Sequence, residues 1–130
     1  MHSITSFIKQ VDQKKINTDG ADSGQCTAIP HLWEKLNGWP IVKGNAKDTF
    51  TNAPTSSYKK VKNAADNFPP PGAIMVWGSS WGKGYGHTGV VVSANAHTFK
   101  AVEQNNGDHG LAHVVTHAHY NGVLGWFIHH

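Results

Sequence analysis

The stretch Pro-Pro-Pro-Gly-Ala-Ile-Met-Val-Trp, residues 69–77, divides this sequence into two halves with different periodicities. Its prolines end any preceding helix, and the apolar run after them has the length and composition of a buried strand. Before the stretch, apolar residues recur at helical spacing, whereas after it short β-branched and aromatic runs alternate with glycine-rich turns. Helices followed by strands predict one α+β domain over residues 1–130, with N-terminal helices packed on an antiparallel β-sheet.

The first half predicts two amphipathic helices. Residues 3–15 form the first, with Ser3 as its N-cap. The second begins at Cys26 and ends at Gly38, and Pro30 falls in its first turn, where a missing N–H is harmless. Its apolar stripe at helical spacing consists of Ile29, Leu32, Trp33 and Leu36. A further short helix is expected over residues 45–50.

The second half predicts five short strands, because β-branched and aromatic runs are bounded there by glycine and polar turns. The expected strands cover residues 73–77, 89–92, 98–105, 112–118 and 123–128.

Composition excludes several classes of protein. Hydrophobic residues make up 38% and charged residues 15% of the 130, which is ordinary for a globular domain. No apolar run approaches the roughly 18 residues of a membrane span, so we expect no membrane insertion. The net charge of +3 comes from lysines spread along the chain without any arginine, so we expect no nucleic-acid partner. We expect a monomer.

The two ends of the sequence also carry expectations. Residues 1–7 lack the basic start and continuous apolar run of a secretory signal, so export would need another route. The terminal pair His129-His130 resembles the remnant of a purification tag, in which case the natural chain could continue beyond it.

The single cysteine, Cys26, lies at the start of the second helix, and a lone cysteine forms no internal disulfide. Unpaired N–H groups and the helix dipole stabilise negative charge at a helix start, so this position favours the nucleophilic thiolate. A free cysteine is also a common small core residue. Whether Cys26 is a nucleophile or a core residue depends on whether a base for its thiol follows later in the chain.

A base and a group to orient it follow later in the chain. His87 stands among glycines at the entry to a buried strand, where another group can approach its ring closely. Alternation along the strand over residues 98–105 places Glu103 and Asn105 on one inward face. A carboxylate on such a face is costly to bury without a hydrogen-bonded partner, and the imidazole of His87 is a suitable partner.

A cysteine on a helix, followed by a histidine and then polar residues on strands, is the papain-like order. Four stretches of the sequence together resemble the CHAP domain, the cysteine, histidine-dependent amidohydrolase/peptidase family. They are Gly24-Gln25-Cys26, Asn45-Ala46-Lys47-Asp48, Gly86-His87-Thr88-Gly89-Val90-Val91-Val92 and Val102-Glu103-Gln104-Asn105-Asn106. The closing Tyr120-Asn121-Gly122-Val123-Leu124-Gly125-Trp126 is similar to the end of that family's phage lysins, so the resemblance spans nearly the whole chain.

The resemblance implies a papain-like fold and a role for each matching residue. The nucleophile would be Cys26, and the general base and later general acid His87. Glu103 would orient and charge the imidazole, with Asn105 as a fourth polar member. Backbone N–H groups at the start of the Cys26 helix, with the Gln25 side chain, would hold the oxyanion.

The resemblance also implies bacteriolytic hydrolysis of peptidoglycan by an endolysin-type enzyme, made in the host cytoplasm and acting on the bacterial cell wall without a required cofactor. N-acetylmuramoyl-L-alanine amidases and endopeptidases both form an acyl-thiol intermediate, so the bond that is cut stays open. Two other classes stay open as well. One is a non-catalytic, His-rich module that binds metal or the wall; the other is a deubiquitinase-like or transglutaminase-like thiol enzyme.

Two aromatic residues flank the glycine-rich run that leads to His87. Trp81 and Tyr85 are candidates for the walls of a substrate groove, because aromatic residues are common in pockets. For Trp81, an exposed loop position is an equal alternative.

A cluster of histidines raises the question of a transition-metal site. On a strand, the side chains of His113, His117 and His119 would share a face, with His109 nearby. Their spacing matches no compact zinc motif, and a solvated strand face is the alternative.

The polar loop before Cys26 raises a second metal question. In phage members of the family this loop resembles an EF-hand and binds calcium through alternating oxygen ligands. Here Asn17, Asp19 and Asp22 are the candidate ligands, whereas Ala21, Ser23 and Ala28 stand where further ligands are expected. A plain polar turn is the alternative.

Overall fold

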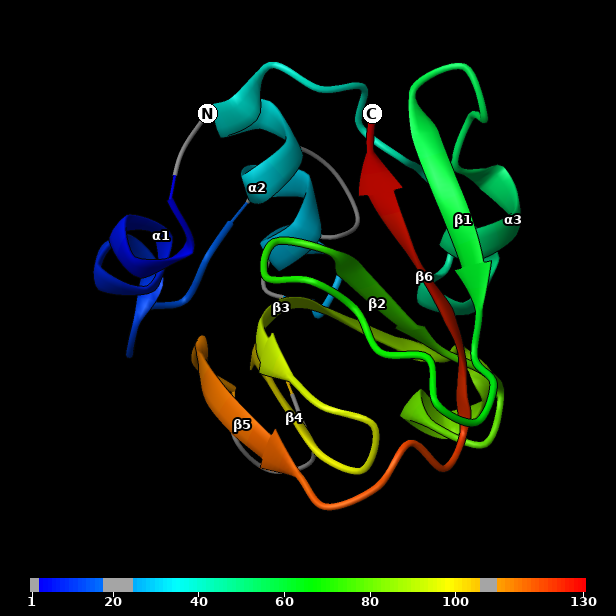
Figure 1. Ribbon diagram of the computed structural model, residues 1–130. Helices are drawn as coiled ribbons and strands as arrows, with labels where there is room; N and C mark the ends of the chain where they lie inside the picture. The colour runs from blue at the N-terminus through cyan, green and yellow to red at the C-terminus, as the bar shows by residue number, and fades with distance from the viewer. Residues whose placement is uncertain (1–2, 18–24, 106–109) are drawn as a thin grey trace.

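A six-stranded antiparallel sheet with strand order β1-β6-β2-β3-β4-β5 organises this computed structural model (Figure 1). The structure describes residues 3–17, 25–105 and 110–130. Its elements are α1 (Ile4–Val11), α2 (Ala28–Asn37), the 3-10 turn η1 (Ala46–Asp48), α3 (Thr49–Asn52), β1 (Tyr58–Lys62), β2 (Ile74–Trp77), the 3-10 turn η2 (Gly82–Gly84), β3 (His87–Ala94), β4 (Phe99–Glu103), β5 (His113–His117) and β6 (Val123–His129). The predicted α+β class, with helices before most strands, is confirmed.

The predicted N-cap of α1 and the predicted C-cap of α2 are confirmed. The Ser3 hydroxyl caps α1 by accepting from the Ser6 backbone N–H at 3.1 Å. Helix α1 ends earlier than predicted, because Gln13 adopts a positive φ of 60° and donates its N–H to the Ala112 carbonyl. Helix α2 ends at Gly38, whose φ of 73° gives the left-handed cap that glycine favours.

The stretch at residues 69–77 is tied to helix α2 by one tryptophan. Trp33 is 2% exposed, and its indole N–H donates to the Gly72 carbonyl at 3.0 Å. The glycine has a φ of 88°, and the Trp33 ring lies against its Cα, so a side chain there would be strained and crowded. The link fixes α2 against the start of β2.

Strand β1 is not among the strands predicted from the sequence. Its residues, Tyr-Lys-Lys-Val-Lys, pair with β6 at one edge of the sheet. Three lysines in five positions conceal the strand pattern, yet lysine is a common residue on edge strands, where it discourages further pairing. Tyr58, at 1% exposed, anchors the strand in the core.

Each face of the sheet has its own apolar core, as the alternation along β2 shows. Ile74 and Val76 pack with α1 and α2, whereas Met75 and Trp77 pack on the opposite face with Phe99 and other residues. Since β2 is buried on both faces, its continuous apolar sequence is explained.

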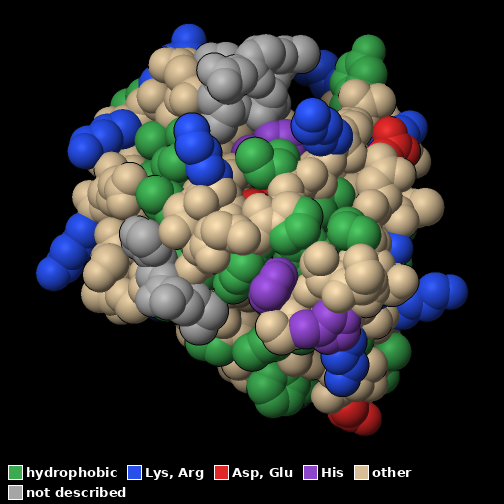
Figure 2. All heavy atoms as spheres, turned by 90° about the horizontal axis from the view of Figure 1, so that it is seen from above, with side chains coloured by type: hydrophobic (Ala, Val, Ile, Leu, Met, Phe, Trp, Pro, Cys, Tyr) green, Lys and Arg blue, Asp and Glu red, His purple; other side chains and the backbone are tan. Residues whose placement is uncertain are grey.

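The surface carries dispersed positive charge. Seen from above, the lysine side chains are scattered around the molecule (Figure 2). Within the described parts of the chain, no helix combines the length and apolarity needed to cross a membrane.

A buried acid lies on helix α2, away from the core that Trp77 and Phe99 form on the opposite face of the sheet. Glu34 of α2 is fully buried, and one of its oxygens accepts the Val42 backbone N–H at 3.1 Å. His31, one turn earlier, bonds through Nε2 to the Val42 carbonyl oxygen at 2.7 Å. Burial raises the pKa of Glu34 to about 8, against the lowering effect of the Val42 hydrogen bond.

We expect Glu34→Gln to stabilise the protein at alkaline pH. The folded state holds the Glu34 proton up to about pH 8, whereas the unfolded chain releases it near 4.5. The stabilising contribution is therefore present below pH 4.5 and is lost as the pH rises through about 8. Urea unfolding at pH 9 should give E34Q a free energy of unfolding above that of the wild type by about 1 kcal/mol or more, and the difference should vanish toward pH 4.5. The exposed substitution Asp66→Asn is the control; a constant difference at all pH values would contradict the expectation.

Candidate functional site

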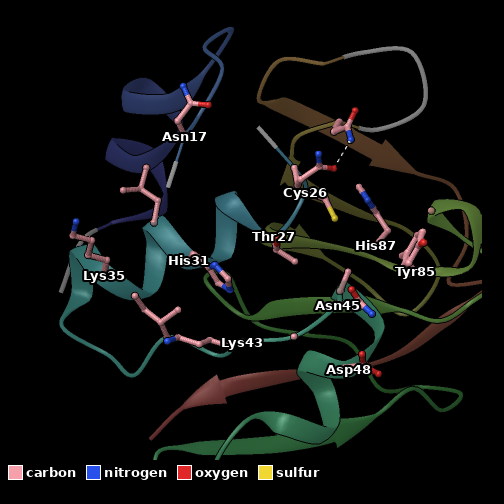
Figure 3. A pocket seen from close by; sticks show the side chains of 18 residues that line it. Asn17, Cys26, Thr27, His31, Lys35, Lys43, Asn45, Asp48, Tyr85 and His87 are labelled. Carbon is pink, nitrogen blue, oxygen red and sulfur yellow. Dashed lines mark hydrogen bonds between the residues drawn. The ribbon is translucent and has the colours of Figure 1, made fainter. Parts of the chain in front are cut away.

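A groove on the molecule brings Cys26 and His87 together (Figure 3). The start of α2 forms one side of it, and the glycine-rich turn before β3 forms the other. The sulfur of Cys26 points toward the ring of His87 in the close view. The groove is also lined by Asn17, Gln25, Thr27, His31, Leu32, Lys35, Ile41, Lys43, Gly44, Asn45, Ala46, Asp48, Gly82, Tyr85, Gly86 and Asn105.

Cys26 lies in the turn that leads into α2 and carries a free, half-buried thiol. The predicted position at a helix start is close to the observed one, because α2 begins at Ala28. The carbonyl of Cys26 accepts from the Ile29 N–H at 3.3 Å, so its peptide already belongs to the first helical turn. Thus the thiol lies beside the N-terminal end of α2, where negative charge is stabilised.

His87 opens β3 and is 4% exposed. Its Nε2 lies 2.6 Å from Oε1 of Glu103, which leaves Nδ1 as the ring nitrogen for Cys26. The preceding Gly86 has a φ of 82°, and a Cβ there would lie 2.6 Å from the backbone nitrogen of Lys47. Only glycine allows this close approach, which places His87 at the groove.

Glu103 ends β4 with no exposed surface. As expected, it lies on an inward face with an imidazole as its partner. A Cβ on Gly89 of the neighbouring strand would lie 2.7 Å from Cγ of Glu103, so glycine makes the room in which the carboxylate lies. The glycines near His87 therefore make room for other parts of the same chain: Gly86 for the Lys47 backbone and Gly89 for the Glu103 side chain.

A second histidine, which was not predicted from the sequence as a partner of Glu103, bonds to the same carboxylate. Nε2 of His117, from β5, lies 2.5 Å from Oε2 of Glu103. His117 is 8% exposed, so the expectation of a solvated strand face is wrong for it. The sequence left a metal site and a solvated strand face open for the histidine cluster, and neither predicts a bond from His117 to Glu103, which depends on the pairing of β5 with β4.

The electrostatics of these groups depend on one another. Burial alone lowers the pKa of His87, but hydrogen bonds to Cys26 and Glu103 and the charges of both raise it to about 9. Burial alone raises the pKa of Glu103, but hydrogen bonds from His117 and His87 bring it below the ordinary value. At neutral pH the site therefore holds an imidazolium beside an ionised carboxylate.

Asn105 lies apart from His87's carboxylate partner. Strand β4 ends at Glu103, and Asn105 has a left-handed φ of 56°, so the expectation that both share a strand face is wrong. Its Nδ2 donates to Oε1 of Gln25 at 3.1 Å at the groove. Asn105 therefore orients the Gln25 carboxamide.

Gln104 is a further buried residue that the sequence analysis missed. Its Nε2 donates to the Gln25 carbonyl at 2.9 Å and to the Ile16 carbonyl at 3.0 Å, and its Oε1 accepts the Ile16 N–H at 2.6 Å. The side chain thus fixes the backbone just before Cys26 to β4.

The two aromatic candidates differ in position. Tyr85 is 64% exposed and lines the groove. Trp81 packs behind the site instead, stacked on His87 at a centroid distance of 5.9 Å and 5.8 Å from the His117 ring.

The predicted metal ligands are placed only in part. Asn17 is exposed at the groove, whereas Asp19, Asp22 and His109 lie outside the described residues. His119 follows the end of β5, and its Nδ1 accepts the Asn121 N–H, so it does not extend a strand face with His113 and His117. Within the described ranges, no three His, Cys, Asp or Glu side chains gather as a metal site.

Comparisons with known proteins give a family match and several similar folds. A statistical model of the CHAP domain matches residues 16–105. The chain is similar to the crystal structure of a wild type endolysin, LysIME-EF1, with a TM-score of 0.79 and 23% identity over 98% of this chain and 64% of that one. It is also similar to Ly7917 with the hydrolyzing product of MDP, with a TM-score of 0.70 and 14% identity over 98% of this chain and 63% of that one. The chain thus spans less than two thirds of the length of either, and the likeness to them shows a shared fold.

We expect the His87 ring to titrate near pH 9, and Glu103→Gln to lower that midpoint by about one pH unit or more, because the substitution removes the adjacent negative charge. The midpoint can be followed by NMR of nitrogen-15-labelled histidine rings. Glu34→Gln, a change of the other glutamate, is the matched control and should leave His87 unmoved. Equal midpoints in E103Q and the wild type would contradict the assigned role of the charge.

Proposed function

Because this chain belongs to the CHAP domain family, we propose that it hydrolyses an amide or peptide bond of bacterial peptidoglycan, with Cys26 as the nucleophile. The observation that carries the proposal is the sequence of contacts from Cys26 through His87 to Glu103 at the wall of an open groove. These are the nucleophile, the acid–base group and the orienting group that thiol-dependent acyl transfer requires. The endolysin likeness supports the bacterial wall as the site of action.

In the acylation step, the Cys26 thiolate attacks the carbonyl carbon of the scissile bond. The new S–C bond forms, and the C–N bond breaks as the His87 imidazolium donates its Nδ1 proton to the leaving nitrogen. With a pKa of about 9, His87 holds this proton before the substrate arrives, so it acts first as an acid. Water then attacks the thioester, His87 takes a proton from that water, and the S–C bond breaks.

Negative charge that develops on the carbonyl oxygen needs donors. The N–H groups of Ala28 and Ile29 already donate to the carbonyls of Gln25 and Cys26, so the candidate donors are the Gln25 carboxamide, which lines the groove, and the backbone N–H of Cys26. Since Asn105 holds Oε1 of Gln25, the amide nitrogen is left to face the substrate. One such donor lowers the free-energy barrier of acylation by about 3 kcal/mol.

The groove extends well past the reacting groups and is charged unevenly. Lys35 and Lys43 lie toward one end, and Asp48 lies near Tyr85 at the other (Figure 3). Peptide stems of peptidoglycan carry free carboxylates, which the two lysines can attract. The arrangement supports a peptide-containing wall fragment as the substrate, oriented with an anionic group toward Lys35 and Lys43.

Calcium bound by Asn17, Asp19 and Asp22 is a separate proposal. The amide and carboxylate oxygens of this set are ligands of the kind that calcium prefers, and bound calcium would stabilise the loop before Cys26. No step of the reaction described above runs through the ion.

We expect Cys26→Ala to slow the release of soluble fragments from purified sacculi at least about a thousandfold, with unchanged circular dichroism and thermal unfolding. Mass spectrometry of the wild-type digest identifies the bond: new muramoyl lactyl carboxyl groups mark an amidase, and new amino termini in the stem or bridge mark an endopeptidase. Undiminished release by C26A would refute the proposed nucleophile. Binding to sacculi without release by either protein would favour the wall-binding alternative.

We expect the pair Lys35→Glu and Lys43→Glu to raise KM for soluble stem-peptide fragments about tenfold with little change in kcat, because the groove would lose about 1.4 kcal/mol of attraction. The matched control changes Lys59 and Lys62 of β1 to Glu, which gives the same net charge away from the groove. Equal effects of the two double variants would show that overall charge, rather than the groove, is responsible.

A further inference from the structure

The carboxylate of Glu103 is shared between two histidines from the two strands that flank β4. His87 of β3 takes Oε1 at 2.6 Å, and His117 of β5 takes Oε2 at 2.5 Å. Both oxygens of a fully buried carboxylate are thus bonded to ring nitrogens. Each His Nε2 in contact with an ionised carboxylate serves as a donor, because the carboxylate only accepts.

The ring of His117 is held in this orientation by aromatic packing. It stacks on Phe99 at a centroid distance of 4.6 Å and an interplanar angle of 17°. Trp77 lies against it at 5.0 Å. His117 is not among the residues that line the groove, and Glu103 is the group of the site to which its ring is hydrogen-bonded.

We propose that His117 is a positioning residue of the reaction, whose Nε2–H holds Glu103 ionised and turned toward His87. The proposal rests on the proposed function, because it concerns the same catalytic groups. His117 itself neither contacts the substrate nor exchanges a proton with it.

The physical reason for this role is the cost of burying a charge beside the apolar core that contains Trp77 and Phe99. A carboxylate there needs more than one donor to remain ionised, since the apolar surroundings favour the neutral acid. Without His117, Oε2 would lose the hydrogen bond from the His117 ring, which favours protonation of the buried acid. A neutral Glu103 would no longer supply the charge that keeps the proton on His87.

Other titratable groups near Glu103 can be named from each neighbouring strand. His87 approaches from β3 with Cys26 beyond it, and β5 brings both His117 and His113, which lies opposite Glu103 in the register. Nδ1 of His113 is bonded to the Leu111 carbonyl oxygen. The test therefore has to change His117 without changing His113.

The chain has only two glutamates, Glu34 and Glu103, so carbon-13 labelling of the glutamate carboxyl gives two NMR signals. Glu34→Gln assigns them by removing one. In His117→Phe, the midpoint of the Glu103 signal should rise by about one pH unit or more. His117→Gln, whose carboxamide N–H reaches a similar place, should restore it. An unmoved midpoint in H117F, or equal midpoints in H117F and H117Q, would overturn the proposal.

Hydrolysis gives a second readout. The acid side of the kcat/KM profile on soluble fragments should move to higher pH in H117F and return in H117Q, whereas the exposed His119→Phe leaves it unchanged. A purely structural role would lower activity at all pH values alike. If the wild type itself releases no fragments, the proposed function fails while the carboxyl titration still decides the role of His117.

A measurement that needs no substitution of His117 covers the case in which H117F does not fold. The Nε2–H proton of His117 should resonate far downfield in the wild type and move upfield in Glu103→Gln, because the charged acceptor has been removed. The same resonance in both proteins would overturn the proposal.

Discussion

The buried carboxylate of Glu103 is the constraint to which the rest of the site is fitted. It has no exposed surface, so it is stable only where donors reach both of its oxygens. Three adjacent strands satisfy this requirement together: β4 carries the acid, and β3 and β5 each bring one histidine. A slip of one residue in either pairing would turn a histidine to the wrong face, so the site also specifies the register of the sheet.

The residue next to Glu103 connects the sheet to the turn that carries Cys26, the proposed nucleophile. Gln104 directly follows the last residue of β4. It is fully buried and bonds to the backbone of Ile16 and Gln25, on the approach to α2. Two consecutive residues at the end of β4 thus contact both sides of the site: Glu103 bonds to His87, and Gln104 bonds to the peptide before Cys26.

The sequence predicted what depends on local periodicity and failed where pairing decides. The helices followed from their apolar stripes and from Ser3 and Gly38, which act within one turn. The strand β1 was missed because its three lysines are explained only by its place at the sheet edge. For His117 the sequence left a metal site and a solvated strand face open, since its partner Glu103 lies fourteen positions earlier and comes close only when β4 and β5 pair. Asn105 was placed on a strand that in fact ends two residues before it.

The charge on His87 links this framework to the order of proton transfers. An imidazole as buried as this one would ordinarily be neutral, because burial disfavours the charged form. Here the ring lies between the thiol of Cys26 and the carboxylate of Glu103, and their combined effect raises its pKa to about 9. The proton is therefore on the ring at neutral pH, where the proposed reaction needs an acid for the leaving nitrogen. That protonation state depends on Glu103 remaining ionised, so the order of proton transfers in the proposed reaction depends on a buried carboxylate outside the groove.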